Sequence, residues 1–341
     1  MNGLSGHGRN IGVAAALTSV VMFLVLLMLW MLGVSPSEAA AQLFLGSMGS
    51  TGAWVATLRH FVPICLLATG ISLAARGGLW NIGAEGQWIA GALAGWLAAS
   101  ACGHWSLALL AGGLGGGLVV AIPTLLAVRR NVSEVLTTLM FNFLMLEVLR
   151  YSIAGPLQEP TGQFPQTAPI PPGAHLPLWH FTAARGAPLS LLIAVLCAVL
   201  VQLFLFRTRQ GLLIRATQSA PRAVTTGGFS PEKARFIALL LSGGLCGLAG
   251  SIQVCGDTLL VDRSIASGLG YTAIAAALLA GKQPLWCIPS AFLFAVLYTA
   301  SASLQWARDL PAMDRFALLV QGLLVLAILA ALAARRRPAV H

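Results

Sequence analysis

The sequence predicts an all-α protein that crosses a membrane about ten times. Of its 341 residues, 57% are hydrophobic and 9% are charged, whereas a soluble domain usually carries about 25% charged residues. The mean hydropathy is +0.84. Apolar stretches recur along the whole chain, and about 20 apolar residues are enough to cross the hydrocarbon core. We therefore expect residues 1–341 to form a single transmembrane domain of a polytopic membrane protein.

Ten apolar stretches are candidates for membrane spans. The first is too long for the apolar region of a signal peptide and has no small-residue cleavage site soon after it, so we expect it to stay in the protein. The second and the eighth are short and flanked by glycine, and pairs of short, interrupted segments often mark the binding region of a transporter. The expected spans are 11–33, 61–75, 82–101, 106–128, 133–153, 188–206, 235–255, 266–281, 285–303 and 311–334.

The distribution of lysine and arginine predicts that both chain ends lie in the cytoplasm. With ten spans and a cytoplasmic N-terminus, 14 of the 20 basic residues fall on the inner side and 6 on the outer side. This bias follows the positive-inside rule. It also accounts for the net charge of +10, which in a soluble protein would suggest a nucleic-acid partner.

Two loops between the spans are long enough to do more than connect them. The outer loop, 154–187, contains seven prolines (156, 160, 165, 169, 171, 172 and 177), which favours either an ordered extracytoplasmic cap or a plain connector. The inner loop, 207–234, combines a basic start, a short helix-like run and a glycine stop. Such a helix is suited to docking into a groove of a cytoplasmic protein, and the alternative is a patch that attracts acidic lipids.

The run Arg76–Gln87 is polar and rich in glycine, although apolar segments precede and follow it. Broken helix inside a membrane persists only within protein or along a wet cavity. Glu85 could line a transport path or close an inner gate, or it could be a structural carboxylate at a helix N-terminus. Asn81 and Gln87 could bind a polar solute or satisfy the open backbone of the break. The charge map places this run at the cytoplasmic mouth of the second and third spans.

Further candidate residues lie on the fifth span and after the seventh. Thr138 and Asn142 are one helical turn apart, so that they share a face. They could offer neutral donors and acceptors to a solute, or form hydrogen bonds between helices. Asp257, Asp262 and Arg263 follow the seventh span at the outer side, where they could receive an extracytoplasmic partner through charge pairs or remain solvated loop charges.

No catalytic or metal site is expected from the sequence. The six cysteines form no CxxC pair and lie almost entirely in apolar stretches, so they are interpreted as small buried side chains. The glycine-rich stretch Gly243–Gly247 lies inside an expected span and lacks the lysine of a nucleotide-binding loop. The chain is therefore not expected to be an enzyme, to bind a cofactor or to hydrolyse ATP by itself.

Four blocks of the chain carry a resemblance: Gly78–Gln87, Ser133–Asn142, Leu241–Gly250 and Gly270–Pro284. In order and spacing they resemble the permease subunits of ABC importers. The family is that of the branched-chain amino acid, ribose and nucleoside permeases, and the similarity is greatest to its nucleoside or simple-sugar branch. The asparagine–glycine–glutamate–glycine–glutamine pattern is characteristic of that branch.

The resemblance implies a type II importer fold of about ten helices in two pseudo-symmetric halves, in a bacterial inner membrane. It implies two cytoplasmic ATP-binding subunits, which use the ATP, a periplasmic or lipid-anchored substrate-binding protein, and a second homologous permease in a heterodimer. The expected function is translocation of nucleosides or related simple sugars by alternating access. The alternatives are a ribose-type sugar or a branched-chain amino acid as the solute, or an ion-coupled secondary transporter.

A secondary transporter would be favoured by more buried carboxylates than the chain offers in Glu85, Glu134 and Glu147.

In an ABC importer of this family, the candidate residues fall into three groups. The expected roles are the path or gate for Asn81, Glu85, Gln87, Thr138 and Asn142; coupling to the ATPase for Gly211, Arg215, Ala216, Ala220, Arg222 and Gly227; and docking of the binding protein for Asp257, Asp262 and Arg263.

Overall fold

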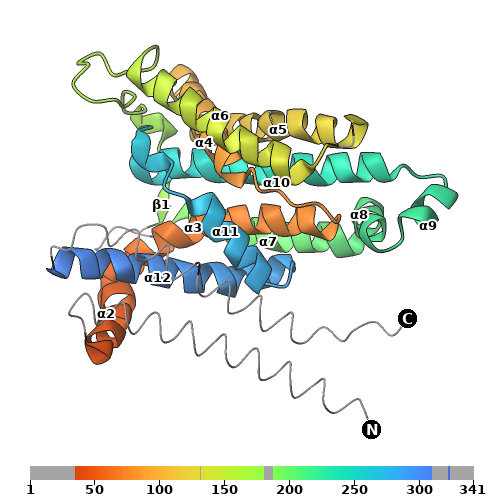
Figure 1. Cartoon of the computed structure of the whole chain (residues 1–341). Helices are drawn as coiled ribbons and strands as arrows, with labels where there is room; N and C mark the ends of the chain where they lie inside the picture. Colours follow the sequence, from red (N-terminus) through yellow and green to blue (C-terminus); the bar gives the residue numbers. More distant parts are fainter. Residues whose placement is uncertain (1–34, 131, 180–186, 309–321, 323–341) are drawn as a thin grey trace, which may run out of the picture. The chain divides into compact units, whose positions relative to one another are not determined.

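The computed structural model describes residues 35–130, 132–179, 187–308 and 322, and most of them are helical (Figure 1). The chain divides into two compact units, residues 58–292 and residues 1–57 with 293–341. The α-helices are α2 (Pro36–Met48), α3 (Thr51–Arg76), α4 (Ala84–Cys102), α5 (Trp105–Arg130), α6 (Glu134–Ala154), α7 (Leu189–Arg207), α8 (Arg209–Ser219), α9 (Pro221–Thr226), α10 (Pro231–Gln253), α11 (Leu269–Leu279) and α12 (Cys287–Arg308). The short elements are η1 (Pro172–Ala174), η2 (Val254–Thr258), η3 (Arg263–Ile265), η4 (Pro284–Trp286), and the antiparallel strands β1 (Leu178–Trp179) and β2 (Ala187–Pro188).

Six segments of the described chain are long and apolar enough to cross a membrane. Helix α4 and the shorter α11 occupy two more of the expected spans. The expected spans 11–33 and 311–334 lie outside the described residues. The structure thus confirms a helical, multi-pass membrane protein, while the total of ten spans and the pseudo-symmetry stay predictions. The six segments are Thr51–Arg76, Trp105–Ala127, Glu134–Ala154, Leu189–Arg207, Pro231–Thr258 and Pro284–Ser303.

The prediction of a short second span was wrong. Helix α3 has 26 residues, which corresponds to about 39 Å at 1.5 Å per residue. The expected span began at residue 61, but the helix begins at Thr51 and continues through Arg59, His60 and Pro63. The charge of Arg59 is tolerated because its guanidinium forms an ion pair with Asp257, at 2.8 Å.

The core of residues 58–292 is built on close contacts between small residues of α4, α5 and α10. A Cβ atom added at Gly247 of α10 would collide with the backbone of Gly112 and Gly116 in α5, and one added at Gly91 of α4 would collide with Gly247. Small residues let helix backbones approach in a membrane, where the hydrophobic effect does not drive helices together. Figure 1 shows α4, α5 and α10 side by side.

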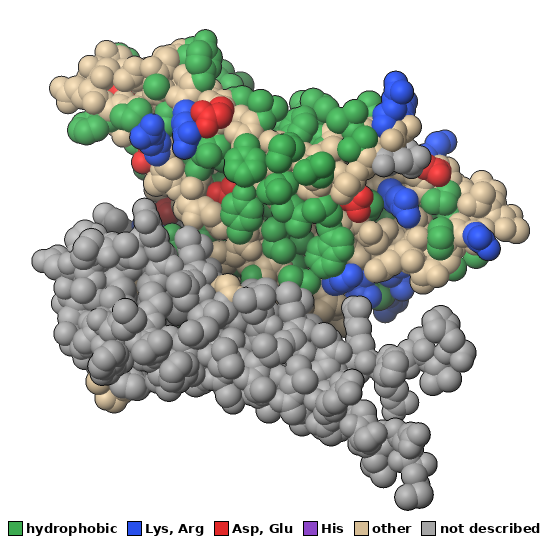
Figure 2. Space-filling view, in the orientation of Figure 1, with side chains coloured by type: hydrophobic (Ala, Val, Ile, Leu, Met, Phe, Trp, Pro, Cys, Tyr) green, Lys and Arg blue, Asp and Glu red, His purple; other side chains and the backbone are tan. Residues whose placement is uncertain are grey.

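The outer faces of these helices are apolar. On α5, the side chains of Leu110, Leu114 and Leu118 are 65–69% exposed, and their spacing of four residues places them on one face. Figure 2 shows hydrophobic side chains over the middle of the visible face, with several lysines and arginines gathered where α8 and α9 lie. We call that end, at which α3, α5 and α7 finish with Arg76, Arg130 and Arg207, the basic end. An apolar belt of this kind suits contact with lipid tails.

The described part of the outer loop is an ordered layer over the opposite end of these helices. The backbone N–H groups of Thr167, Ile170 and Leu176 donate to carbonyls in the segment 255–261, at 2.8–2.9 Å. The indole Nε1 of Trp96 in α4 donates to the carbonyl of Ala168, at 2.8 Å. These contacts favour an ordered cap over a plain connector.

The other unit contains α2, which the sequence did not lead us to expect. The Thr57 hydroxyl at the start of α3 donates to the carbonyl of Ser47 in α2, at 2.8 Å. Gly46 lies so close to Ser303 of α12 that a Cβ atom would collide with the serine side chain. Short-range packing of small and hydroxyl side chains therefore holds α2 in this unit.

Candidate functional site

Residues 77–83 are not helical and separate Arg76, where α3 ends, from Ala84, where α4 begins. We call this segment the break. Asn81, in the break, and Gln87, in the first turn of α4, form a reciprocal pair: each side-chain amide nitrogen donates to the oxygen of the other, at 2.8 Å. Asn81 Nδ2 also donates to the Ser242 hydroxyl of α10, at 2.9 Å. Both amide side chains are almost fully buried. Their donors and acceptors are therefore used inside the protein, as the structural interpretation of these two residues requires.

Asn142 of α6 satisfies the open backbone of the break. Its Oδ1 accepts the backbone N–H of Gly86 and its Nδ2 donates to the carbonyl of Ile82, both at 2.8 Å. Thr138, one turn earlier, donates its hydroxyl to the carbonyl of Glu134 in its own helix, at 2.7 Å. The two residues do share a buried face, as the spacing predicted. That face packs on the break, because a Cβ atom at Gly83 would lie 2.9–3.0 Å from atoms of Thr138.

Glu85 binds the N-terminus of the short helix α11. The backbone N–H of Gly268 donates to Oε1 at 2.8 Å, and that of Gly270 donates to Oε2 at 2.6 Å. Gly268 caps α11 with a left-handed φ of 81°. Glu85 also lies in the first turn of α4, so one carboxylate meets the positive dipole ends of two helices. A Cβ atom at Gly270 would lie 2.6–2.8 Å from Glu85.

Asn81 lies deeper between the helices than the distribution of charged residues suggested. Arg76 is at the basic end, as expected, but Asn81 contacts Ser242, the twelfth of the 23 residues of α10. At 1.5 Å per residue, Ser242 lies about 16 Å from the start of α10. The difference arises because the charge map locates only charged groups near the helix ends, whereas the residues after Arg76 turn back between the helices. The run thus extends from Arg76 at the basic end to Asn81 beside the middle of α10.

Two aromatic residues near the break also connect its parts. Trp88 of α4 is fully buried and donates its indole N–H to the carbonyl of Ile265, at 2.7 Å. Tyr271, in the first turn of α11, accepts a hydrogen bond from Asn142 Nδ2 at 3.3 Å, and 43% of its surface is exposed. One hint of this contact is present in the sequence, because a buried indole N–H usually requires an acceptor and Trp88 directly follows Gln87.

The inner loop forms two helices, α8 and α9, in place of the single helix expected. Thr208 caps α8 by accepting the N–H of Gly211, at 3.1 Å. A Cβ atom at Gly211 would collide with the backbone of α7, so this glycine sets how closely α8 approaches α7. Helix α9 is exposed except for Val224, and the large apolar side chains of Leu212 and Phe229 are 57% and 54% exposed.

The predicted coupling residues thus separate into two groups. Gly211 and Arg215 face α7, since the Arg215 Nε donates to the carbonyl of Leu205 at 2.9 Å. Ala216 is half-buried. The exposed group, which is available for contact with another protein, consists of Ala220, Arg222 and Gly227.

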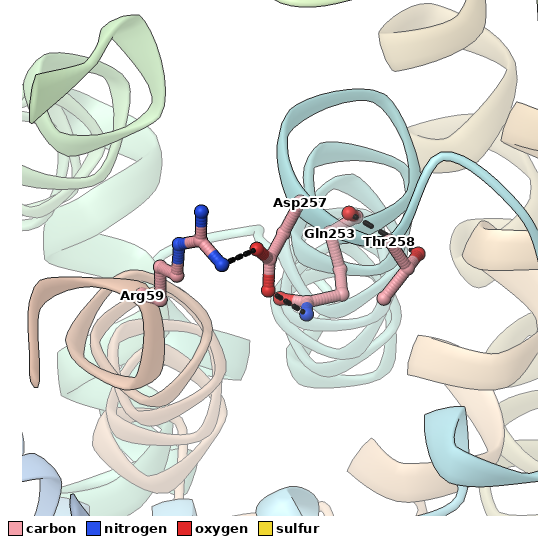
Figure 3. Close-up of polar contacts among 4 residues, drawn as sticks. All are labelled: Arg59, Gln253, Asp257 and Thr258. Atoms are coloured by element: carbon pink, nitrogen blue, oxygen red, sulfur yellow. Dashed lines mark hydrogen bonds and ion pairs between the residues drawn. The ribbon is translucent and has the colours of Figure 1, made fainter. Parts of the chain in front are cut away.

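The predicted docking residues lie at the opposite end of the helices. Asp257 is engaged within the chain: one oxygen pairs with Arg59 at 2.8 Å, and the other accepts the Gln253 amide at 2.9 Å (Figure 3). Asp262 accepts the backbone N–H of Ser264, at 3.0 Å, and is partly exposed. Arg263 is exposed.

Among the described residues, no group of three or more histidine, cysteine, aspartate or glutamate side chains could hold a metal ion. What these residues do build is a broken helix and a half-length helix whose ends are satisfied inside the protein. Discontinuous helices of this kind are typical of membrane transporters. The class that the fold and the site define is therefore a helical membrane transport protein.

Comparison with known proteins identifies the family. Residues 53–329 match the family described as the branched-chain amino acid transport system / permease component. Because this match covers most of the chain, the chain belongs to that family, and the resemblance of the four sequence blocks is confirmed.

Several relatives are ABC transporter permease proteins. The chain is 30% identical over 294 residues to the glucose permease protein TsgB13 of Haloferax volcanii, covering 82% of this chain and 77% of the relative. It is 28% identical over 288 residues to the guanosine permease protein NupP of Bacillus subtilis, covering 82% of each. A second guanosine permease protein of B. subtilis, NupQ, is 26% identical over 272 residues, covering 75% of this chain and 84% of the relative. No solved structure matches the chain.

Proposed function

We propose that this chain is the transmembrane permease subunit of an ABC importer that translocates nucleosides or related simple sugars by alternating access. The observation that carries the proposal is the family match over residues 53–329, together with relatives named for glucose and guanosine. Both of these solutes are neutral and rich in hydroxyl groups.

The chemistry of the break supports a neutral solute. The buried polar side chains in the break and in the helices that contact it are amides and hydroxyls, apart from Glu85. The carboxylate of Glu85 already occupies the N-terminus of α11, because it accepts the N–H groups of Gly268 and Gly270. An amino acid substrate would bring a carboxylate that seeks a helix N-terminus of this kind. That position is filled from within the chain.

The basic end suits the cytoplasmic side, in agreement with the positive-inside rule. There α9, Leu212 and Phe229 form an exposed, partly apolar surface for the ATP-binding subunits. The binding protein would approach the opposite end, where Asp262 and Arg263 reach solvent. A second permease is supported by NupP and NupQ, two guanosine permease proteins of one organism that both match this chain. ATP hydrolysis would belong to the separate subunits.

Reconstitution of the whole importer tests this function. The chain is purified with its ATP-binding subunits, second permease and binding protein, and placed in liposomes with labelled guanosine, glucose or leucine. We expect ATP-dependent uptake of guanosine or glucose. Uptake should be lost when Arg222 is replaced by glutamate at the exposed surface, and Arg222→Lys, which keeps the positive charge, is the control that should retain uptake. Ion-driven uptake by this chain alone, or ATP-dependent uptake of leucine only, would overturn the proposal.

A further inference from the structure

Phe206 lies near the end of α7, where it contacts two arginines from different helices. The guanidinium carbon of Arg215, from α8, is 4.5 Å from the centroid of the Phe206 ring. The guanidinium carbon of Arg76, at the end of α3, is 5.6 Å from the same centroid. Both distances fall within the range of about 6 Å in which a cation is attracted to an aromatic face. One ring therefore joins α8 to the end of α3.

Arg76 extends this series of contacts towards α11. Its Nε donates to the carbonyl of Lys282, at 2.7 Å. Lys282 terminates the turn after α11 with a left-handed φ of 62°, and its ammonium nitrogen is 4.8 Å from the centroid of the Trp80 ring. Trp80 belongs to the break before α4. Contacts thus run without interruption from α8 through Phe206 to the turn after α11 and to the break.

The ring is the group that the two arginines share. Like charges repel each other, so a ring that attracts both guanidinium groups offsets part of the cost of bringing them to the same place. In the part of the chain that the structure describes, the ion pairs are Arg59 with Asp257 and Arg150 with Glu147. Neither Arg76 nor Arg215 is paired with a carboxylate there, and the face of Phe206 takes that place.

We propose that Phe206 is a positioning residue that couples displacement of α8 to α11 and the break. The inference rests on the proposed function, in which the ATP-binding subunits act on α8 and α9. When α8 moves, Arg215 moves with it. Because Arg215 and Arg76 both contact the Phe206 ring, Arg76 moves as well. Arg76 in turn holds the carbonyl that ends the turn after α11. Ile214 of α8 also packs against Leu73 of α3, so the two helices stay in contact without the ring. What is lost without it is the common partner of the two arginines, and with it the link from Arg215 to the guanidinium that holds the carbonyl of Lys282.

The variants Phe206→Leu and Phe206→Trp test the coupling in the reconstituted importer. Leucine keeps an apolar side chain but removes the aromatic face, whereas tryptophan keeps the face. We measure basal ATPase activity, its stimulation by the binding protein loaded with guanosine, and guanosine uptake for each ATP hydrolysed. Phe206→Leu should lower stimulation and uptake about fivefold or more, the range of an allosteric coupling, while basal ATPase and the yield of complex stay native. Phe206→Trp should behave as the native chain.

Two outcomes of these assays would overturn the proposal. The first is native stimulation and uptake in Phe206→Leu. The second is a parallel fall in complex yield, basal ATPase and uptake, because that pattern belongs to a purely structural side chain.

A labelling measurement keeps the inference separate from the identity of the solute. Gln283 is exposed next to Lys282, so Gln283→Cys is labelled with a maleimide in a background in which the exposed Cys102 is replaced by serine. The labelling rate should differ between the nucleotide-free and the ATP–vanadate states, and Phe206→Leu should abolish this difference. Retention of the difference in Phe206→Leu would refute the coupling role. Absence of guanosine uptake together with a difference that depends on Phe206 would contradict only the proposed solute.

Discussion

Replacement of Glu85 by alanine tests whether its carboxylate joins the break to α11. The side chain is 6% exposed and accepts the N–H groups of Gly268 and Gly270, at 2.8 and 2.6 Å. The alanine variant leaves both donors without an acceptor, one in the buried Gly270 and the other in the half-buried Gly268. Hydrogen bonds to charged groups contribute about 1.5–3 kcal/mol each, whereas those between membrane helices reach at most about 1.7 kcal/mol. The ranges overlap near 1.5 kcal/mol, so two bonds give a loss of about 3 kcal/mol.

The conservative variant Glu85→Gln separates the two bonds. A glutamine oxygen can accept one of the N–H groups, but its NH₂ group then faces the other donor. We expect a loss of about 1.5 kcal/mol, half that of the alanine variant. Both values are measured as changes in the free energy of unfolding, from titration with a denaturing detergent in mixed micelles.

Glu147→Gln is the matched control for removal of a carboxylate. Its side chain is 65% exposed and pairs with Arg150 on the same helix, so we expect a change of about 0.5 kcal/mol or less. If Glu85→Ala unfolds at the same detergent fraction as the native protein, or no earlier than the Glu147 variant, the carboxylate does not hold α11. If Glu85→Gln loses as much as Glu85→Ala, the two bonds do not contribute separately.

Three further substitutions test other contacts. Gly247→Ala should lower the free energy of unfolding by about 1–3 kcal/mol because it overpacks α10 against α4 and α5, whereas Gly113→Ala, whose Cβ would lie 3.6 Å from the nearest atom, should be neutral; equal losses would contradict the close packing. Asn142→Ala should cost about 1–3 kcal/mol and speed hydrogen exchange at the break, and unchanged exchange would show that the amide does not protect this backbone. Arg59→Ala should lower the free energy of unfolding by about 1 kcal/mol or less, and this effect should shrink in high salt. Arg150→Ala should lower the melting temperature less, because the Arg150–Glu147 pair is more exposed. A larger effect at Arg150 would argue against this ranking.

The class of fold could be predicted from the sequence because it depends on local properties. Apolar stretches near the thickness of a bilayer identified most of the helices, and the glycines and amides of Arg76–Gln87 identified the break. The length of α3 could not be predicted in this way. Its charged residue Arg59 is compensated by Asp257, and no local pattern in the sequence indicates that these two residues meet.

The roles of the site residues were predictable only as alternatives. The sequence left two alternatives for Glu85, a path or gate and a structural carboxylate at a helix N-terminus. Its carboxylate binds the backbone of Gly268 and Gly270, more than 180 residues away. Backbone N–H groups are present at every residue except proline, so that their use as ligands leaves no mark in the composition. Asn142 could be placed on a helical face by its spacing, but the direction of that face depended on how α6 packs against α4.

The contacts at the break bear on how an alternating-access cycle can proceed. Asn81, Gln87, Asn142 and Glu85 each satisfy backbone or side-chain groups of the chain itself. Opening the break would leave several of these buried groups unpaired, at about 1–3 kcal/mol each, and nothing in a neutral, hydroxyl-rich solute replaces a carboxylate at the N-terminus of α11. It costs less free energy to move the break and α11 together than to part them. The break and α11 then move as one rigid unit of the permease. A displacement driven by ATP would reach this unit at the basic end, where Arg76 donates to the carbonyl of Lys282 in the turn after α11.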